Sequence, residues 1–140
     1  MIPEYLIREW TKDRPQVPRF NMIGVQAAGA ATSLTMDHVI DKNYDCIIQA
    51  MCCETTAGGA QTVTSIQFRI VDKQGNFNRI MSFVATTPRV QETLNWQGAE
   101  LYIPQGYIVR CVCFYSAGAI SNSASFSLSS LFVPETNFLK

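Results

Sequence analysis

Apolar and polar residues alternate along much of this chain, which is the pattern of half-buried β-strands. The alternation is clearest in residues 63–71. There Ile66, Phe68 and Ile70 share one face, and polar side chains occupy the other. Similar patterns or short apolar runs predict further strands at 20–28, 44–53, 77–85, 107–115 and 123–133, and a strand at 93–103 that is broken by Gly98.

These strands predict the fold class. Roughly seven or eight of them, joined by connections of about four to eight residues, are typical of an antiparallel sandwich. No helical pattern alternates with the strands, which argues against a parallel α/β sheet. We therefore expect an all-β fold, an antiparallel β-sandwich of the jelly-roll type. Its core should contain Ile48 together with Ile66, Phe68 and Ile70.

The first twenty residues differ from this body. Residues 3–12 are the one segment with a helical pattern, and Pro15 and Pro18 favour an extended chain after it. A helix of about three turns is too short to be stable alone in water, so it needs a groove to lie in. Its apolar cluster consists of Tyr5, Leu6, Ile7 and Trp10.

We accordingly divide the chain into an N-terminal arm (1–20), a sandwich domain (21–134) and a short C-terminal tail (135–140). The arm is expected to dock on a neighbouring protein. The alternative is that it folds back over the outer face of strand 107–115, which is apolar on both faces. The other interface candidates lie at the end of the arm and in the tail: Phe20, Phe138 and Leu139.

Charge is scarce and balanced. Lys plus Arg and Asp plus Glu both number 11, so a basic nucleic-acid-binding surface is not expected. Segments 20–36, 55–68 and 111–134 carry no charge at all. Charge is the feature most depleted at the cores of subunit interfaces. The chain is therefore expected to form a symmetric homo-oligomer, with a trimer among the candidate symmetries.

Five cysteines occur without CxxC spacing, and no signal peptide or membrane-spanning run is present in the sequence. An odd number of cysteines indicates synthesis where thiols stay reduced, as in a host cytoplasm, and no membrane partner is expected. Strand parity places Cys111 and Cys113 on one face, and Cys46 and Cys52 on another. A thiolate metal site is the alternative to core packing. Because C-x-C within a strand lacks the usual ligand spacing, we expect free, buried thiols and no metal or other cofactor.

Catalytic motifs are missing. The Gly/Ala/Thr/Ser-rich segment after residue 28 is expected to be a loop, leading to a solvated His38, the one histidine. A single histidine excludes sites that need two. Glu92 and Glu100 could flank a sugar, but eleven acids supply such pairs by chance. We expect no enzymatic activity and no catalytic residues.

Aromatic residues offer a binding alternative. Trp96 with Tyr102 and Tyr107 could form a platform for a sugar, although a tryptophan beside a strand break is more often an edge anchor. A sugar site of this kind needs exposed aromatics beside acid or amide groups. A protein that assembles would bury the same aromatics against its neighbours.

The segment LYIPQGYIVR (101–110) resembles the aliphatic-Ile-Pro-Gly-aliphatic turn of jelly-roll decoration and fibre-head modules. With its charge-poor body, its arm and its apolar tail, the chain is similar to small virion proteins of tailed bacteriophages. The resemblance implies a capsid decoration (cement) protein located in the virion. Its partners would be other virion proteins, such as the major capsid protein, and its own copies. The alternative is a carbohydrate- or receptor-binding module.

Overall fold

The chain forms antiparallel strands in the part that the structure describes. That part comprises residues 19–40, 44–95 and 101–134 of a computed structural model. Its strands are β1 (Arg19–Gly29), β2 (Ser33–Val39), β3 (Tyr44–Thr56), β4 (Val63–Val71), β5 (Phe77–Thr87), β6 (Arg89–Asn95), β7 (Leu101–Ile103), β8 (Ile108–Tyr115) and β9 (Asn122–Pro134). Within these ranges, no helix is long and apolar enough to cross a membrane.

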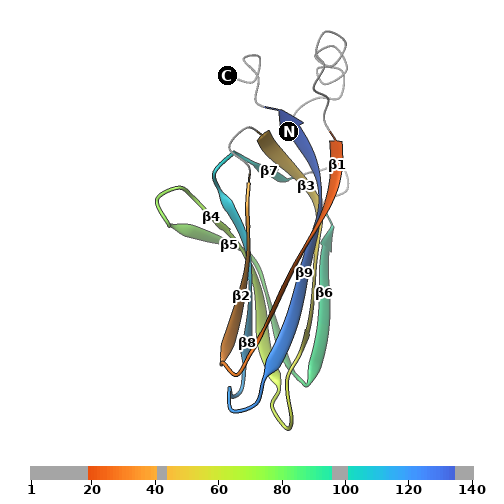
Figure 1. The fold of residues 1–140 in the computed structure, drawn as a ribbon, viewed down its shortest axis with the longest axis vertical. Coiled ribbons are helices and arrows are strands. Elements are labelled where there is room, and N and C mark those ends of the chain that lie inside the picture. Colours follow the sequence, from red (N-terminus) through yellow and green to blue (C-terminus); the bar gives the residue numbers. More distant parts are fainter. Residues whose placement is uncertain (1–18, 41–43, 96–100, 135–140) are drawn as a thin grey trace.

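Two sheets pack face to face (Figure 1). Sheet A has the order β1-β9-β3-β6, with the short β7 also paired to β3, and sheet B has the order β2-β8-β4-β5. Most connections cross from one sheet to the other, and only the β4–β5 hairpin and the β6–β7 link stay within a sheet. The eight strands other than β7, interleaved between the two sheets in this order, form a jelly roll. The predicted all-β jelly-roll sandwich is confirmed.

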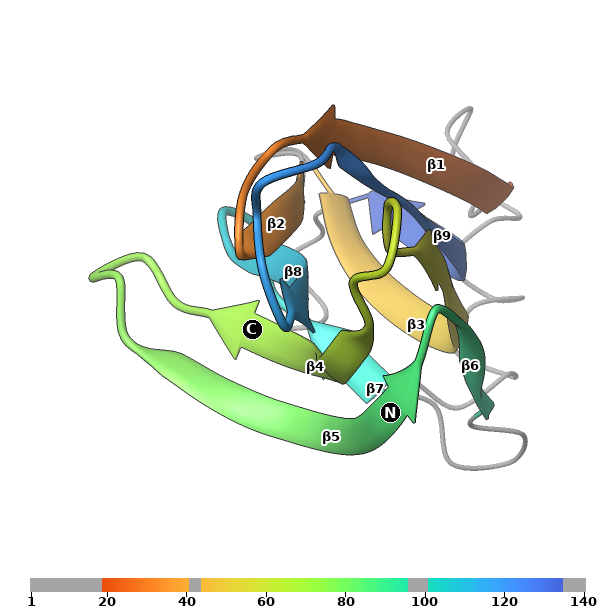
Figure 2. The same cartoon turned by 90° about the horizontal axis from the view of Figure 1, so that it is seen from below.

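The core lies between the sheets and contains most of the residues predicted for it. Ile48, Ile66 and Phe68 are completely buried. Phe68 packs at 6.0 Å, ring centroid to ring centroid, against Phe126 of the facing sheet. Ile70 is only half-buried and packs against the edge of this core. It lies near the end of the β4–β5 hairpin, which projects beyond the rest of the sandwich (Figure 2).

One predicted loop is wrong. The Gly/Ala/Thr/Ser-rich segment after residue 28 contains β2, which pairs with β8 along its whole length. Leu34 and Met36 alternate into the core with polar residues between them. His38 therefore lies on a strand and is half-buried, and it is not a solvated loop residue. The small residues that suggested a loop belong to the turn at 30–32.

The strand predicted at 93–103, with a break at Gly98, is two separate strands. β6 ends at Asn95 and β7 begins at Leu101, and Gly98 itself lies outside the described residues. Both strands pair with β3, β6 through the C-terminal half of β3 and β7 through its N-terminal half. The predicted start was wrong, because β6 begins at Arg89 and not at residue 93.

A β-bulge in β3 changes which cysteines share a face. The register of β3 against β9 shifts between Ile48 and Ala50, so one extra residue reverses the alternation of side chains. Cys46 and Cys53 are buried, whereas Cys52 is only half-buried. The prediction that Cys46 and Cys52 share a face is therefore wrong. Cys111 and Cys113 do share the inward face of β8.

Candidate interaction surfaces and a buried thiol cluster

The start of β1 and the end of β9 lie at the same end of the sandwich. Strand β1 begins beside the end of β9, with Arg19 opposite Phe132 (Figure 1). Phe20 lies in β1 opposite Leu131. The remaining interface candidates belong to segments 1–18 and 135–140 and lie outside the described residues: Tyr5, Leu6, Ile7, Trp10, Phe138 and Leu139.

The outer face of sheet A is built from small uncharged side chains. The four serines at alternate positions of β9, from Ser123 to Ser129, point to this face while Phe126 and Leu128 point to the core. The neighbouring strand β1 also presents uncharged residues here, with Gly24 opposite Ser127 and Gln26 opposite Ser125. Over this part of the face a second protein backbone could approach closely.

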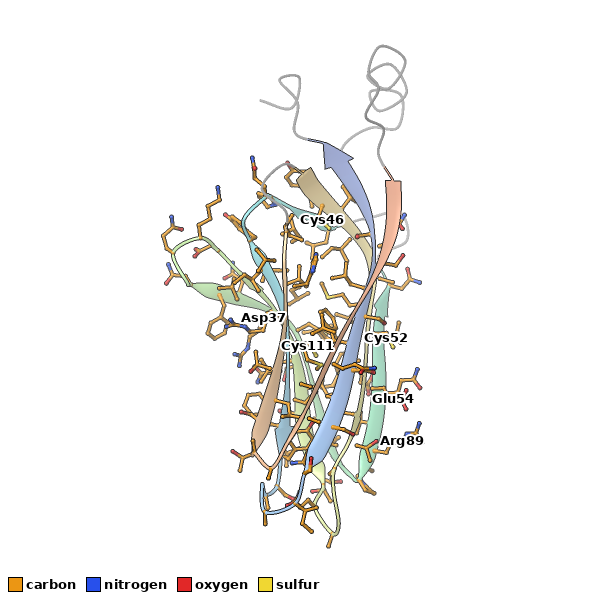
Figure 3. The ribbon with its side chains drawn as sticks, viewed as in Figure 1. Asp37, Cys46, Cys52, Glu54, Arg89 and Cys111 are labelled. Atoms are coloured by element: carbon orange, nitrogen blue, oxygen red, sulfur yellow. The ribbon has the colours of Figure 1, made fainter. Side chains whose placement is uncertain are left out.

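A shallow open trough of about 610 Å³ crosses this face. Its lining comes from β1, β3 and β9: Gln26, Ala27, Ala28, Glu54, Thr56, Ser123, Ala124 and Ser125. At one side Arg89 of β6 pairs with Glu54 on the outer surface (Figure 3). The lining offers amide, hydroxyl and carboxylate groups but no aromatic side chain. It therefore lacks the aromatic platform that the carbohydrate alternative requires.

Sheet B presents a different outer surface. Val112 of β8 lies on its outer side and is nevertheless buried, with 4% of its surface exposed. The guanidinium of Arg69 covers the rings of Phe77, at 4.4 Å, and of Phe114, at 5.9 Å. The apolar residues on the outer face of sheet B are thus covered partly by long side chains of the same sheet. The edge strand β5 remains apolar in places, and Val84 is 85% exposed.

Buried side-chain amides hold together the other end of the sandwich, where the β1–β2, β3–β4 and β8–β9 loops meet. The side-chain oxygen of Asn122 accepts hydrogen bonds from Gly58 N (2.9 Å) and Gln61 Nε2 (2.8 Å). Its amide nitrogen donates to the carbonyls of Ala31 (2.9 Å) and Ala117 (3.3 Å). These contacts join the β1–β2, β3–β4 and β8–β9 loops into one unit.

The residues considered for sugar chemistry do not form a site in the described part of the chain. Glu92 lies on β6 opposite Cys53, and its suggested partner Glu100 is outside the described residues, as is Trp96. Tyr102 lies on β7 and is partly exposed, whereas Tyr107 packs against the core.

Three cysteines meet in the core, a convergence that sequence analysis missed. The sulfur atoms of Cys53, Cys111 and Cys113 all lie within 4.8 Å of one another. Cys53 comes from sheet A and the other two from sheet B, and the Cys53 and Cys113 sulfurs are 3.4 Å apart. All three side chains are completely buried.

Two hydroxyl groups extend this cluster. Thr55 Oγ1 lies 2.5 Å from Tyr115 Oη and donates its proton to the carbonyl of Ser123 at 2.8 Å, so Tyr115 is the donor to Thr55. Hydrogen bonds from Cys111 and Cys53 lower the pKa of Cys113 to about 4, against the opposing effect of burial. The hydrogen bond to Cys113 and burial raise the pKa of Cys111. Cys113 is therefore the most acidic of the three thiols in the cluster.

Comparison with known proteins gives no family. No family model matches the chain, and no curated protein matches it. Among solved structures, a chain in the structure of infectious bursal disease virus Gx strain is similar to this protein, with 15% sequence identity and a TM-score of 0.43. The match covers 86% of this chain and 33% of the viral chain. The VP2 subviral particle of infectious bursal disease virus is 16% identical, also with a TM-score of 0.43, covering 86% and 34%.

A third solved structure is the carbohydrate-binding module TmCBM61 in complex with β-1,4-galactotriose. It is 12% identical with a TM-score of 0.35, and the match covers 83% of this chain and 88% of that one. The chain thus spans about a third of the length of the viral proteins that it resembles. Similarity of this extent carries no information on function.

Proposed function

We propose that the protein is a non-enzymatic structural component of a virion, which decorates and stabilises an assembled shell. One observation supports the proposal: the start of β1 and the end of β9, to which the predicted arm and tail are joined, lie at the same end of the sandwich. Both predicted docking segments can therefore reach one partner surface. The opposite end is closed by the hydrogen bonds of Asn122 and would face away from the shell.

The outer face of sheet A supports self-association in the same assembly. Its serine-rich floor on β9 is uncharged, and Glu54 and Arg89 neutralise each other at its side. Small uncharged side chains allow a neighbouring copy to approach without burying an unpaired charge. Copies arranged around a symmetry axis would thereby bury this face while their arms contact the shell.

The test is binding of the full-length protein to purified shells of major capsid protein that lack it, measured by co-sedimentation. Trp10→Ala is expected to weaken binding by roughly 30-fold or more, because a buried tryptophan anchor contributes about 2–4 kcal/mol. Ile120→Ala is the control, since Ile120 is an exposed apolar residue at the opposite end. Equal binding by the wild type and Trp10→Ala would contradict the proposal.

A carbohydrate- or receptor-binding role is the alternative, for which the trough offers amide, hydroxyl and carboxylate groups but no aromatic platform. Oligosaccharide binding measured by calorimetry would support this role if Glu54→Gln weakened it and Gln74→Ala did not. Gln74 is exposed at the β4–β5 turn, far from the trough in sequence and on the other sheet.

A further inference from the structure

Three soft donor atoms converge at the centre of the sandwich without any evident need for them there. A small apolar side chain would fill the same volume, and Cys46 is equally buried in the core but lies outside this cluster. Figure 3 shows Cys46 towards the β7 end of the molecule, away from Cys111. The clustering of Cys53, Cys111 and Cys113 thus distinguishes them from the remaining cysteines.

We propose that Cys53, Cys111 and Cys113 bind one thiophilic d¹⁰ metal ion, Zn²⁺ or Cu⁺, between the two sheets. Thiolate sulfur is the donor that such ions prefer. The proposal is independent of any role in a virion.

The distances suit an ion of this kind. Zinc–sulfur bonds of about 2.3 Å place the sulfurs of a tetrahedral site about 3.8 Å apart, and those of a trigonal site about 4.0 Å apart. The Cys53 and Cys113 sulfurs are 3.4 Å apart, and none of the three pairs exceeds 4.8 Å. Side-chain rotations that shift the sulfurs by up to about 1 Å would therefore bring all three to bonding distance.

The three thiols are held by the central strands of the sandwich. Cys111 and Cys113 lie on β8, which is flanked by β2 and β4, and Cys53 lies on β3, which is flanked by β9 and β6. Strands paired on both sides move little, so the folded protein holds the three sulfurs together. An ion bound there would connect sheet A to sheet B.

The surroundings of the cluster hold no competing charge. Among the described residues, the buried polar side chains are all neutral: Thr55, Gln61, Asn122 and Ser130. The thiols would release their protons to solvent on binding, and the ion would offset most of the negative charge that the three sulfurs then carry.

Burial determines how the site must be loaded. Because all three sulfurs are inaccessible in the folded protein, the ion has to enter while the chain folds. The full-length protein is therefore produced in medium supplemented with zinc or copper and purified in reducing buffer without chelator. Elemental analysis and native mass spectrometry then measure metal per chain, and X-ray absorption identifies the atoms bound to it.

The wild type is expected to carry one ion per chain in a shell of sulfur atoms. Cys111→Ala should lose that ion, whereas Cys46→Ala, which removes an equally buried thiol outside the cluster, should keep it. If Cys111→Ala does not fold, the sulfur shell measured on the wild type still decides the question.

Three results would overturn the proposal. The first is a wild-type protein without metal from either medium, and the second is a bound metal whose ligands are not sulfur. The third is a disulfide between Cys53 and Cys113, which forms when a small-molecule disulfide accepts the two electrons and two protons of the thiols. Peptide mapping and a mass lower by two hydrogens would identify that crosslink.

Discussion

Replacing Asn122 tests how the β1–β2, β3–β4 and β8–β9 loops are held together. Its side chain is completely buried and bonds to three loops at once. Asn122→Leu keeps a side chain of similar size but removes both the acceptor and the donor. The N–H of Gly58 and the carbonyl of Ala31 would then lose their side-chain partner, whereas Gln61 would keep its bond to Ile120 O at 3.0 Å.

The magnitude follows from those two lost partners. Each buried polar group left without a hydrogen bond costs about 1–3 kcal/mol. With the weaker contact to Ala117 also lost, Asn122→Leu is expected to lower the free energy of unfolding by about 3–5 kcal/mol. Domains of this size have a total stability of roughly 5–15 kcal/mol, so the loss is a large fraction of it.

Urea unfolding followed by far-UV circular dichroism measures the change. The control is Asn95→Leu, because Asn95 is exposed on β6 and its replacement should alter stability by no more than about 0.5 kcal/mol. The midpoint of Asn122→Leu should fall well below that of the control, with an unchanged slope. A loss of less than about 1 kcal/mol would refute the view that these hydrogen bonds join the loops.

Three further substitutions test other parts of the sandwich by the same unfolding assay. Gly118→Ala places a Cβ atom 2.6 Å from backbone of the β1–β2 turn and should cost about 1–3 kcal/mol, whereas Gly24→Ala meets nothing within 4 Å and should be neutral. Equal effects would contradict this packing. Phe126→Ala should cost about 3–5 kcal/mol, since Phe126 lies at the centre of the core, and a smaller loss would indicate a loosely packed core. Arg110→Ala breaks the two-point contact with Asp37 (2.7 and 2.8 Å) but should cost at most about 1 kcal/mol, and high salt should abolish the difference.

Much of the fold was accessible from local patterns. Alternation in residues 63–71 identified β4 and placed Ile66 and Phe68 in the core, as the structure confirms. Such patterns succeed because one face of each strand is buried, so apolar residues are needed at every second position along the strand. They failed at β2, where Leu34 and Met36 alternate correctly but small flanking residues suggested a loop.

The candidate surfaces were only partly accessible in this way. Serine alternates with apolar residues in the sequence of β9 itself, but only the structure shows which strands lie beside it. The docking roles of Trp10 and Phe138 stay predictions, because both residues lie outside the described part of the chain. That β1 begins beside the end of β9 could not be known without the pairing of the two strands.

The residue types and their periodicity alone thus determined an all-β sandwich with a charge-poor surface. Tertiary structure decided the positions of the cysteines. A single extra residue after Ile48 turns Cys53 inward and Cys52 outward, and no composition or spacing rule reveals such a bulge. Strand pairing then brings Cys53 to Cys113, 60 residues away in the chain. Contacts between residues so far apart in the sequence depend on the topology of the whole fold, whereas the alternation of a strand depends only on residues adjacent in the sequence.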